Sequence, residues 1–528
     1  MTVYTTSGDI ISWIRELLSS VICQEKTESN DFDVAWNDRE VVDWDGEGDE
    51  DNPKNWSFVY KCFVTFLVMV MTIFVYLGSS IVVPGMEDLQ EKFNFSQPVA
   101  ALSLSLFVWG YGIGPMLLSP LTEVARIGRN WPYVISIGLF VIMQVPTVLC
   151  HEAAGFLVLR FIAGFLGSPV LATGGATMAD IWNLNGGLMN GIAFWSYAAC
   201  AGPGMGPLLS GFAVQERGWP WVVWPLLMGT ALTWIFIFFL LPETSADAIL
   251  SRRAKQLRRM TGKHYIRSQG EKRDEEGTLR QLVYNTLCRP IRMTFTEPVL
   301  FFSDLYIAYV YGITFCFFEA FPLTFQEKHE FSIGQSSSAF ITGWIVCAVA
   351  LVLYCLYNQN FVLPRFRSGN WKPEYRMHVC FVGGILFPVS LFWFGWTSFP
   401  KVPPYVPLSA YGIFQCAVFL LFQGFLGYIG EVYPLYTASA YASNGLFRSL
   451  MGGAFPLFSR QMFKKLTVQG GCSLLGGMAI LLLPVTLTFY LYGVSLRKRS
   501  YMVGKLNNNK HELGERHIII SGKDKGNL

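Results

Sequence analysis

Windows of 20 or more mostly apolar residues recur twelve times along this chain, separated by short polar breaks. A helix needs about 20 such residues to cross the roughly 30 Å hydrocarbon core of a bilayer. Charged residues make up 15% of the sequence, whereas soluble domains carry roughly 25%. These features exclude a soluble globule and predict an all-α polytopic membrane protein. The predicted spans are residues 60–84, 97–118, 132–150, 154–178, 188–212, 220–241, 297–323, 338–363, 377–397, 407–430, 438–461 and 472–495.

The spans form two sets of six, separated by a long polar linker at 242–296. Residues 243–297 hold twelve Lys and Arg against seven acids, so the positive-inside rule assigns the linker to the cytosol. An even number of spans in each set then places both termini in the cytosol as well. We expect an N-terminal six-helix bundle at 60–241 and a C-terminal six-helix bundle at 297–495, arranged around a central cavity.

The two tails are predicted to be cytosolic. The N-terminal tail, residues 1–59, carries ten acids and one basic residue between Asp31 and Asp51, a composition typical of disorder. Apolar residues at helical spacing within 10–23 fit a short helix in the membrane interface and a loosely ordered tail equally well. The C-terminal tail, residues 496–528, has three consecutive basic residues at 497–499, as expected on the cytosolic side.

A charged loop rich in Gly and Pro follows the second predicted span. It contains Glu123, Arg126, Gly128 and Arg129. An acid and two arginines on a tight loop can join the ends of neighbouring helices through charge-assisted hydrogen bonds. The loop therefore predicts a latch that is remade in each state of a moving protein, with an ordinary basic inner loop as the alternative.

Three ionisable residues within the predicted spans are candidates for proton coupling. Arg160 lies in the fourth span, and Asp304 and Glu319 lie in the seventh. A charge at membrane depth costs several kcal/mol by most estimates unless it has a partner or a wet cavity, which favours a functional role. The alternatives are that Arg160 extends to the outer interface and that the two acids are paired or, for Glu319, hydrated.

The fifth predicted span contains two prolines and four glycines within ten residues, including Gly202, Pro203, Gly206, Pro207 and Gly211. This composition would break a soluble helix. In a membrane it produces a thin, bent helix against which a second helix can pack closely. Nucleotide binding is not predicted, because no Gly-Lys-Ser/Thr follows and no strand precedes the segment.

Several other function classes lack their sequence signals. The balance of 40 basic and 37 acidic residues does not indicate a nucleic-acid partner. HExxH, GxSxG and P-loop motifs are absent from the sequence, as is a Cys/His cluster at metal-binding spacing, so we predict neither an enzyme nor a cofactor. A channel or a sensor would share the hydropathy of a transporter.

The charged loop, the Arg160 segment and the Gly-Pro span resemble motifs A, B and C of major facilitator superfamily transporters. In the loop, Glu123 lies five residues before Gly128 rather than the usual three. This spacing is similar to the fungal branch linked to azole, benomyl and caffeine resistance. Further segments resemble fungal twelve-span drug:proton antiporters over about residues 51–497. They are Asp51–Trp56, Leu241–Thr244, Ile249–Gly262, Glu297–Val299, Tyr311–Gly312, Phe317–Pro322, Ala438–Ala440, Ser443–Asn444 and Phe447–Ser449.

The resemblance implies a monomeric plasma-membrane antiporter of the major facilitator fold. It implies proton-coupled export of azole-, benomyl- or caffeine-like molecules by alternating access, with drugs, protons and the lipid bilayer as partners. The family role of the motif B arginine in proton coupling carries over to Arg160. A polyamine exporter, for example of spermidine, or another metabolite exporter of the same superfamily is the alternative.

Overall fold

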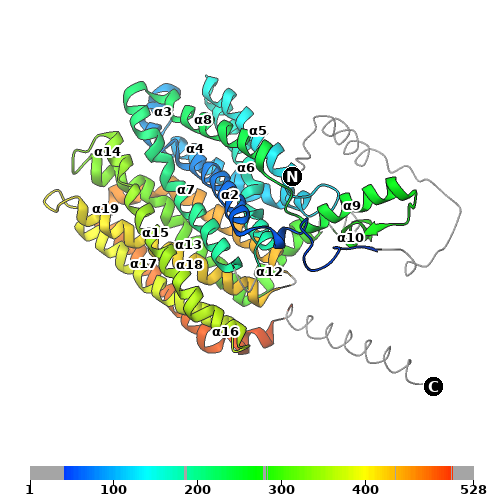
Figure 1. Ribbon diagram of the computed structural model, residues 1–528. Coiled ribbons are helices and arrows are strands. Elements are labelled where there is room, and N and C mark those ends of the chain that lie inside the picture. The colour runs from blue at the N-terminus through cyan, green and yellow to red at the C-terminus, as the bar shows by residue number, and fades with distance from the viewer. Residues whose placement is uncertain are drawn as a thin grey trace, which may run out of the picture.

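The computed structural model describes residues 41–183, 187–276, 281, 284–434, 436–500 and 502. The described chain is a bundle of long helices with one pair of two-residue strands at its edge (Figure 1). The predicted helix within 10–23 and most of the C-terminal tail lie outside the described residues.

Six long helices make up the N-terminal half. Their boundaries follow local signals: Ser57, for example, begins the first by accepting a hydrogen bond from the Tyr60 amide. A short helix, α3, follows the first long helix. The helices are α2 (Phe58–Ser80), α3 (Met86–Phe93), α4 (Gln97–Leu118), α5 (Asn130–Leu149), α6 (Ala153–Ile181), α7 (Leu188–Arg217) and α8 (Trp224–Leu240).

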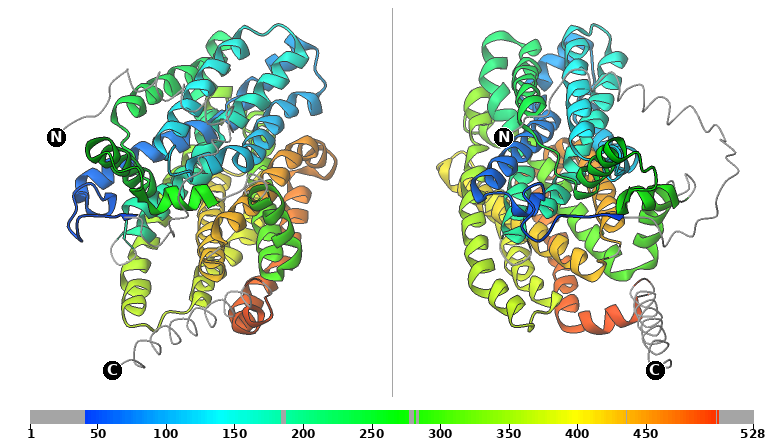
Figure 2. Two further views of the ribbon diagram at one scale, coloured as in Figure 1. Left: turned by 90° about the vertical axis from the view of Figure 1, so that its right-hand side faces the viewer. Right: turned by 45° about the vertical axis from the view of Figure 1, so that its right-hand side comes forward.

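The C-terminal half contains α13 (Pro298–Phe321), α14 (Ile333–Ser338), α15 (Ile341–Tyr357), α16 (Leu363–Arg367), α17 (Met377–Thr397), α18 (Tyr405–Val432) and α19 (Thr437–Arg499). The last of these is two helices joined at Thr467, whose backbone is not helical (φ 64°, ψ 166°). The two halves lie side by side, α2–α8 in blue to green and α13–α19 in yellow-green to red (Figure 2).

Ten helical stretches of the described chain are long and apolar enough to cross a membrane, with α19 counted as one. The 30 residues of α7 are also long enough, but Gly, Pro and Ser make this helix less apolar. With α7 included and α19 divided at Thr467, the described residues contain the twelve long helices that the sequence predicts.

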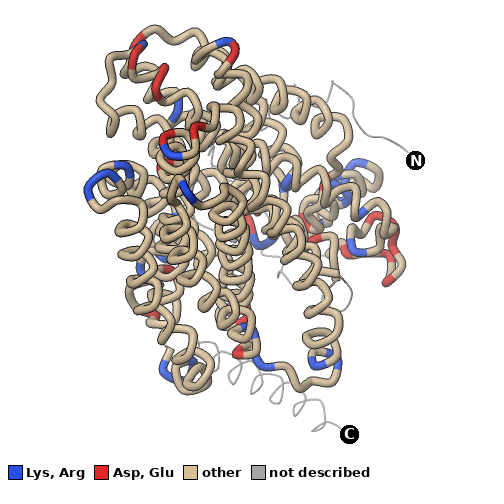
Figure 3. Tube along the Cα trace, turned by 90° about the vertical axis from the view of Figure 1, so that its left-hand side faces the viewer, with Lys and Arg blue, Asp and Glu red and all other residues tan. Residues whose placement is uncertain are grey.

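The linker lies at one end of the bundle, which we call the linker end (Figure 1). It forms α9 (Ala246–Thr261), β2 (Arg267–Ser268), α10 (Gln269–Glu276) and α12 (Arg289–Thr296), and β2 pairs in parallel with β1 (Val41–Val42). The end of the bundle away from the linker, which we call the opposite end, carries α3, α14 and the turn of α19. Charged residues occur in clusters, whereas long stretches of the helices carry none, as a bilayer requires (Figure 3).

The acidic N-terminal segment differs from the predicted disorder where the structure describes it. Arg253 of α9 lies 2.8 Å from Asp49 and 3.0 Å from Asp51. The Asn55 amide also donates to the carbonyl of Glu47, at 2.7 Å. The hydrogen bond from Arg253 lowers the pKa of the Asp49 carboxyl. The linker thus supplies the opposite charge that the acidic sequence lacks.

Candidate functional site

Two polar contacts join the halves near the centre of the bundle. The hydroxyl oxygens of Tyr111 on α4 and Tyr311 on α13 lie 2.5 Å apart. Beside them, Arg448 of α19 donates to the hydroxyl of Tyr76 on α2, at 3.1 Å. All three tyrosines are buried. Four helices from both halves therefore meet at one polar cluster, Tyr76, Tyr111, Tyr311 and Arg448, which we call the central cluster.

Arg448 brings a positive charge to aromatic surroundings. Its guanidinium carbon lies 5.1 Å from the ring centre of Tyr311 and 5.4 Å from that of Phe422. Both distances suit cation–π attraction. Its Nε atom is buried and has no hydrogen-bond partner among the described residues. A buried donor without a partner loses free energy, so the cluster retains an unused site for a hydrogen-bond acceptor.

Close packing of α4 on α19 brings the halves together beside this cluster. A Cβ atom on Gly112 would lie 2.3 Å from the Cβ atom of Ser449, so a larger residue would push the helices apart. The Trp109 indole also donates to the carbonyl of Leu450, at 3.2 Å. The halves are thus in direct contact on both sides of Tyr111.

Arg160 is fully buried and does not extend to the interface, so the snorkelling alternative is wrong. It donates to the carbonyls of Gly78 and Ser79, at 2.7 and 3.1 Å, and to that of Ser103, at 3.0 Å. Its guanidinium carbon also lies 4.5 Å from the ring centre of Phe107. Its hydrogen-bond partners are backbone carbonyls of α2 and α4 rather than a carboxylate. Arg160 therefore joins α6 to two other helices.

Asp304 is buried in the C-terminal half among neutral groups. Its carboxylate accepts hydrogen bonds from the Asn444 amide at 2.9 Å, the Ser443 hydroxyl at 3.0 Å and the Thr294 hydroxyl at 3.2 Å. No Lys or Arg of the described residues lies within ion-pair distance of it. The charge of Asp304 is thus stabilised by hydrogen bonds from α12 and α19.

Glu319 lies on the same helix as Asp304 but 15 residues later, which corresponds to about 22 Å along α13. It is 4% exposed and lines a cavity of about 30 Å³ toward the opposite end. The structure therefore does not bring the three predicted proton-coupling residues together. Arg160 belongs to the N-terminal half, whereas Asp304 and Glu319 occupy separate sites in the C-terminal half.

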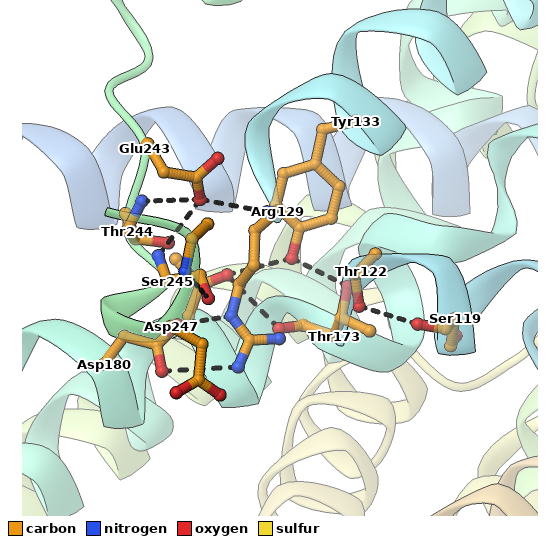
Figure 4. A network of polar contacts seen from close by, with 12 residues as sticks. Ser119, Thr122, Arg129, Tyr133, Thr173, Asp180, Glu243, Thr244, Ser245 and Asp247 are labelled. Atoms are coloured by element: carbon orange, nitrogen blue, oxygen red, sulfur yellow. Dashed lines mark hydrogen bonds and ion pairs between the residues drawn. The ribbon is translucent and has the colours of Figure 1, made fainter. Parts of the chain in front are cut away.

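The charged loop joins helices at the linker end (Figure 4). Arg129 forms an ion pair with Asp180, at the end of α6. Its backbone N–H donates to Glu243, at 2.9 Å. Gly128 precedes it with φ +79°, and a Cβ atom there would lie 2.2 Å from a carboxylate oxygen of Glu243. The glycine is needed both for the turn and for the close approach of Glu243.

The linker helix α10 contacts the same loop. The Asp274 carboxylate accepts from the Ala125 amide at 2.7 Å, and Arg126 lies 3.4 Å from Glu275. Glu123 takes part through its carbonyl, which accepts from Arg273 at 3.3 Å, while its side chain is exposed. Sequence reasoning thus identified the arginines but missed their acidic partners, which are 51 to 149 residues away.

The Gly-Pro span is a continuous helix, α7, despite Pro203 and Pro207. The hydroxyl of Ser80 on α2 donates to the carbonyl of Pro203, at 2.5 Å. A Cβ atom on Gly206 would lie 2.2 Å from that same hydroxyl oxygen, and one on Gly202 would lie 2.6 Å from the Cβ atom of Tyr76. The small residues therefore let α7 pack on α2, as predicted from the composition.

The same helix also meets the C-terminal half toward the opposite end. A Cβ atom on Gly211 would lie 2.4 Å from the Cβ atom of Ser337 on α14. Nearby, the side-chain oxygen of Gln215 accepts from the Gly334 amide, at 3.0 Å. The halves are therefore also in contact toward the opposite end.

A second charged group lies at the linker end of the C-terminal half. Arg376 lies 2.9 Å from Glu431 and donates to the Tyr354 hydroxyl at 3.1 Å. The Trp371 indole donates to the other oxygen of Glu431, at 2.9 Å. Sequence reasoning did not pair these residues. The signal available was an arginine and an acid at the inner ends of two predicted spans.

Comparison with known proteins assigns the family. Residues 68–456 match the family model described as Major Facilitator Superfamily. The chain belongs to the major facilitator superfamily. It is therefore a multi-pass membrane transporter and not an enzyme, as the sequence predicts.

The names of similar proteins narrow the assignment within the superfamily. The chain is 39% identical to "Fluconazole resistance protein 1" of Saccharomyces cerevisiae, over 90% of this chain and 88% of that protein. It is 37% identical to "Cycloheximide resistance protein" of Candida maltosa, over 87% and 85% of the two chains. The resemblance to fungal drug-resistance transporters is thus confirmed.

Solved structures confirm the major facilitator fold. The proton:xylose symporter XylE matches with a TM-score of 0.58 at 14% identity, over 82% of this chain and 97% of that one. A bacterial homologue of the lysosomal transporter Spinster, in an inward-facing conformation, matches with a TM-score of 0.54 at 13% identity, over 84% and 99%. At these identities the likeness concerns the fold alone.

Proposed function

We propose that this protein exports uncharged or weakly acidic aromatic xenobiotics across the plasma membrane, in exchange for protons. The names of its relatives, which refer to fluconazole, cycloheximide and multidrug transport, support drugs as the substrate class. The positive-inside rule supports a cytosolic linker end and cytosolic termini. One chain supplies both halves, which supports a monomer.

The positive charge of the central cluster is the reason why we propose drugs rather than polyamines as substrates. Arg448 offers a buried Nε donor beside the rings of Tyr311 and Phe422. An aromatic molecule with a carbonyl or ring nitrogen can stack on such rings and accept this hydrogen bond. A polyamine carries several positive charges, which Arg448 would repel. The central cluster therefore favours drug export over the polyamine alternative.

Asp304 has the surroundings expected of a residue that gains and loses a proton. The hydroxyls of Ser443 and Thr294 can donate to its carboxylate or accept from its protonated form, because a hydroxyl does both. No buried cation fixes its charge among the described residues. We assign proton binding to Asp304 and Glu319, and we assign to Arg160 the positioning of α2 and α4 around α6.

Alternating access requires contacts that differ between the two states. In this proposal the linker end opens and closes between two charged groups that each stay within one half, Arg129 with Asp180 in the N-terminal half and Arg376 with Glu431 in the C-terminal half. Drug and proton must each favour one state over the other, because a ligand of equal affinity for both shifts nothing.

The experiment is transport into proteoliposomes that contain purified protein, with and without an imposed pH gradient. Fluconazole or cycloheximide should accumulate only with the gradient, whereas spermidine should not. Accumulation of spermidine would support the polyamine alternative. Drug flux that ignores the gradient would support a channel and contradict proton coupling.

A further inference from the structure

A small cavity between the halves contains two acids and one arginine. It has a volume of about 30 Å³ and lies at the opposite end, and such a volume can hold a water molecule. Glu87 of α3 lines it from the N-terminal half. Glu319 of α13 and Arg460 of α19 line it from the C-terminal half.

These three side chains differ in depth. The side chain of Glu87 is 71% exposed and that of Arg460 is 16% exposed, whereas Glu319 is 4% exposed. Arg460 Nη2 lies 3.6 Å from Glu87 Oε1. The Glu319 carboxylate has no ion pair within 4 Å among the described residues. From the surface inward, the order is thus Glu87, Arg460 and Glu319, with the deeper acid unpaired.

The two acids stand in different relations to Arg460. Glu319 and Arg460 belong to the same half, so they stay near each other when the halves move. Glu87 belongs to the other half and leaves when the opposite end opens. An exposed ion pair such as Arg460 with Glu87 is weak, so the arginine can exchange one acid for the other at low cost.

We propose that Arg460 is a switch that pairs with Glu87 when the opposite end is closed and with Glu319 when it is open. Protonation of Glu319 in the open state removes its negative charge and frees Arg460 to pair with Glu87, which closes this end. Loss of that proton in the other state lets Arg460 return to Glu319. The step transfers one proton to a carboxylate and nothing else.

Other ionisable groups near Glu319 do not supply this exchange. Lys464, one helical turn beyond Arg460, also acts on Glu319 electrostatically, but its side chain is exposed. The Cys316 thiol of α13 is buried and does not line this cavity. Neither contacts the N-terminal half as Arg460 does. The inference rests on the proposed proton coupling and adds the residue that links it to closure.

The test measures the separation of the halves and needs no drug. Spin labels on genetically encoded ketone side chains replace the exposed residues Glu91 of α3 and Lys465 of α19, in the full-length protein in lipid nanodiscs. The distance between the labels is recorded from pH 4.5 to pH 9. In the unmodified background, we expect the short distance to dominate at low pH and the long one to gain at high pH.

Three variants test the switch, and two serve as controls. Glu319→Gln should keep the short distance at all pH values, and Glu87→Gln should favour the long distance. Arg460→Gln should remove most of the pH response. Glu327→Gln, an acid at the same end, should leave the response unchanged, and Lys464→Gln should move its midpoint to higher pH without removing it.

A pH response that survives Arg460→Gln, or one that Lys464→Gln abolishes, would overturn the proposal. The protein could also show the expected pH response in the label distance but transport no drug into proteoliposomes. That result would support the switch and contradict the proposed function.

Discussion

The hydroxyl groups of Tyr111 and Tyr311 form a 2.5 Å contact between residues that are 200 positions apart. One tyrosine belongs to each half, and both are buried. The ring of Tyr76, whose hydroxyl accepts from Arg448, stands edge-on to that of Tyr111, with the ring centres 5.6 Å apart. A movement that separates the halves here must therefore break a hydrogen bond and expose the guanidinium of Arg448. The central cluster is both a contact between the halves and our proposed drug site.

Tyr111→Phe is expected to favour separation of the halves. It removes one hydroxyl and leaves that of Tyr311 buried without its partner, at a cost of about 1–3 kcal/mol in the closed arrangement. The spin-label distance between α3 and α19 measures this shift. Tyr309→Phe is the matched control, because the Tyr309 hydroxyl bonds the carbonyl of Leu475 within the C-terminal half. An equal shift in both variants would show that the contact between the halves has no special role.

Arg448→Gln should weaken drug export by about tenfold or more. A hydrogen bond to a charged group is worth about 1.5–3 kcal/mol, and 1.4 kcal/mol corresponds to about tenfold in affinity. The loss should appear in KM for drug uptake into proteoliposomes, and Arg448→Lys should recover only part of it because a lysine lacks the planar guanidinium. If Arg448→Gln instead improves uptake of drugs and leaves spermidine excluded, the assignment of Arg448 to substrate binding is wrong.

Arg160→Ala should mainly lower stability. The change removes the charged donor of the carbonyls of Gly78, Ser79 and Ser103, and a hydrogen bond to a charged group is worth about 1.5–3 kcal/mol. Thermal unfolding in detergent measures this loss. Arg160→Lys keeps the charge but presents a single ammonium, so it should fold with intermediate stability. Because we assign Arg160 a positioning role, the folded fraction of Arg160→Lys should still export drug with a pH gradient; complete uncoupling in that variant would show a direct role.

Asp304→Asn should separate drug movement from proton movement. The amide can accept from Asn444 through its oxygen and donate to the hydroxyls of Ser443 and Thr294, so the hydrogen bonds survive and the protein should fold. It cannot bind and release a proton at neutral pH. We expect gradient-driven accumulation of drug to disappear while exchange of labelled for unlabelled drug persists. Ser443→Ala is the control, since it removes one hydrogen bond and keeps the acid; loss of coupling in both would point to structure rather than protonation.

The sequence predicted the membrane-spanning helices, but it did not predict most of the contacts between them. Apolar length identified the spans, because a bilayer sets the same requirement for each helix independently. The burial cost of Arg160 correctly marked it as a residue with partners, but carbonyl partners leave no signal in a sequence. Asp180 and Glu243 were missed as partners of Arg129 because only the packing of α5, α6 and α9 brings them together.

The acidic N-terminal segment shows the same limit. Its charge predicted disorder, yet Arg253, about 200 residues later, binds Asp49 and Asp51. Charge composition within a segment cannot reveal a counter-charge elsewhere in the chain. The sequence also could not show that Arg160, Asp304 and Glu319 lie at three separate sites. Each of them gives the same sequence signal, an ionisable residue in an apolar span.

Gly128→Ala should destabilise the loop at the linker end more than a turn glycine ordinarily does. Two costs combine there: φ is +79°, and the new Cβ would lie 2.2 Å from a carboxylate oxygen of Glu243. Gly262→Ala is the matched control, because Gly262 has φ +69° with no atom within 4 Å of such a Cβ, so it carries only the backbone cost of about 1 kcal/mol. Thermal unfolding of the two variants, and of each combined with Glu243→Ala, separates the backbone cost from the cost of the close contact with Glu243. Removing the Glu243 side chain should relieve part of the loss in Gly128→Ala and none in Gly262→Ala, whereas equal losses in the two glycine variants would show that Glu243 moves aside freely and does not hold the loop.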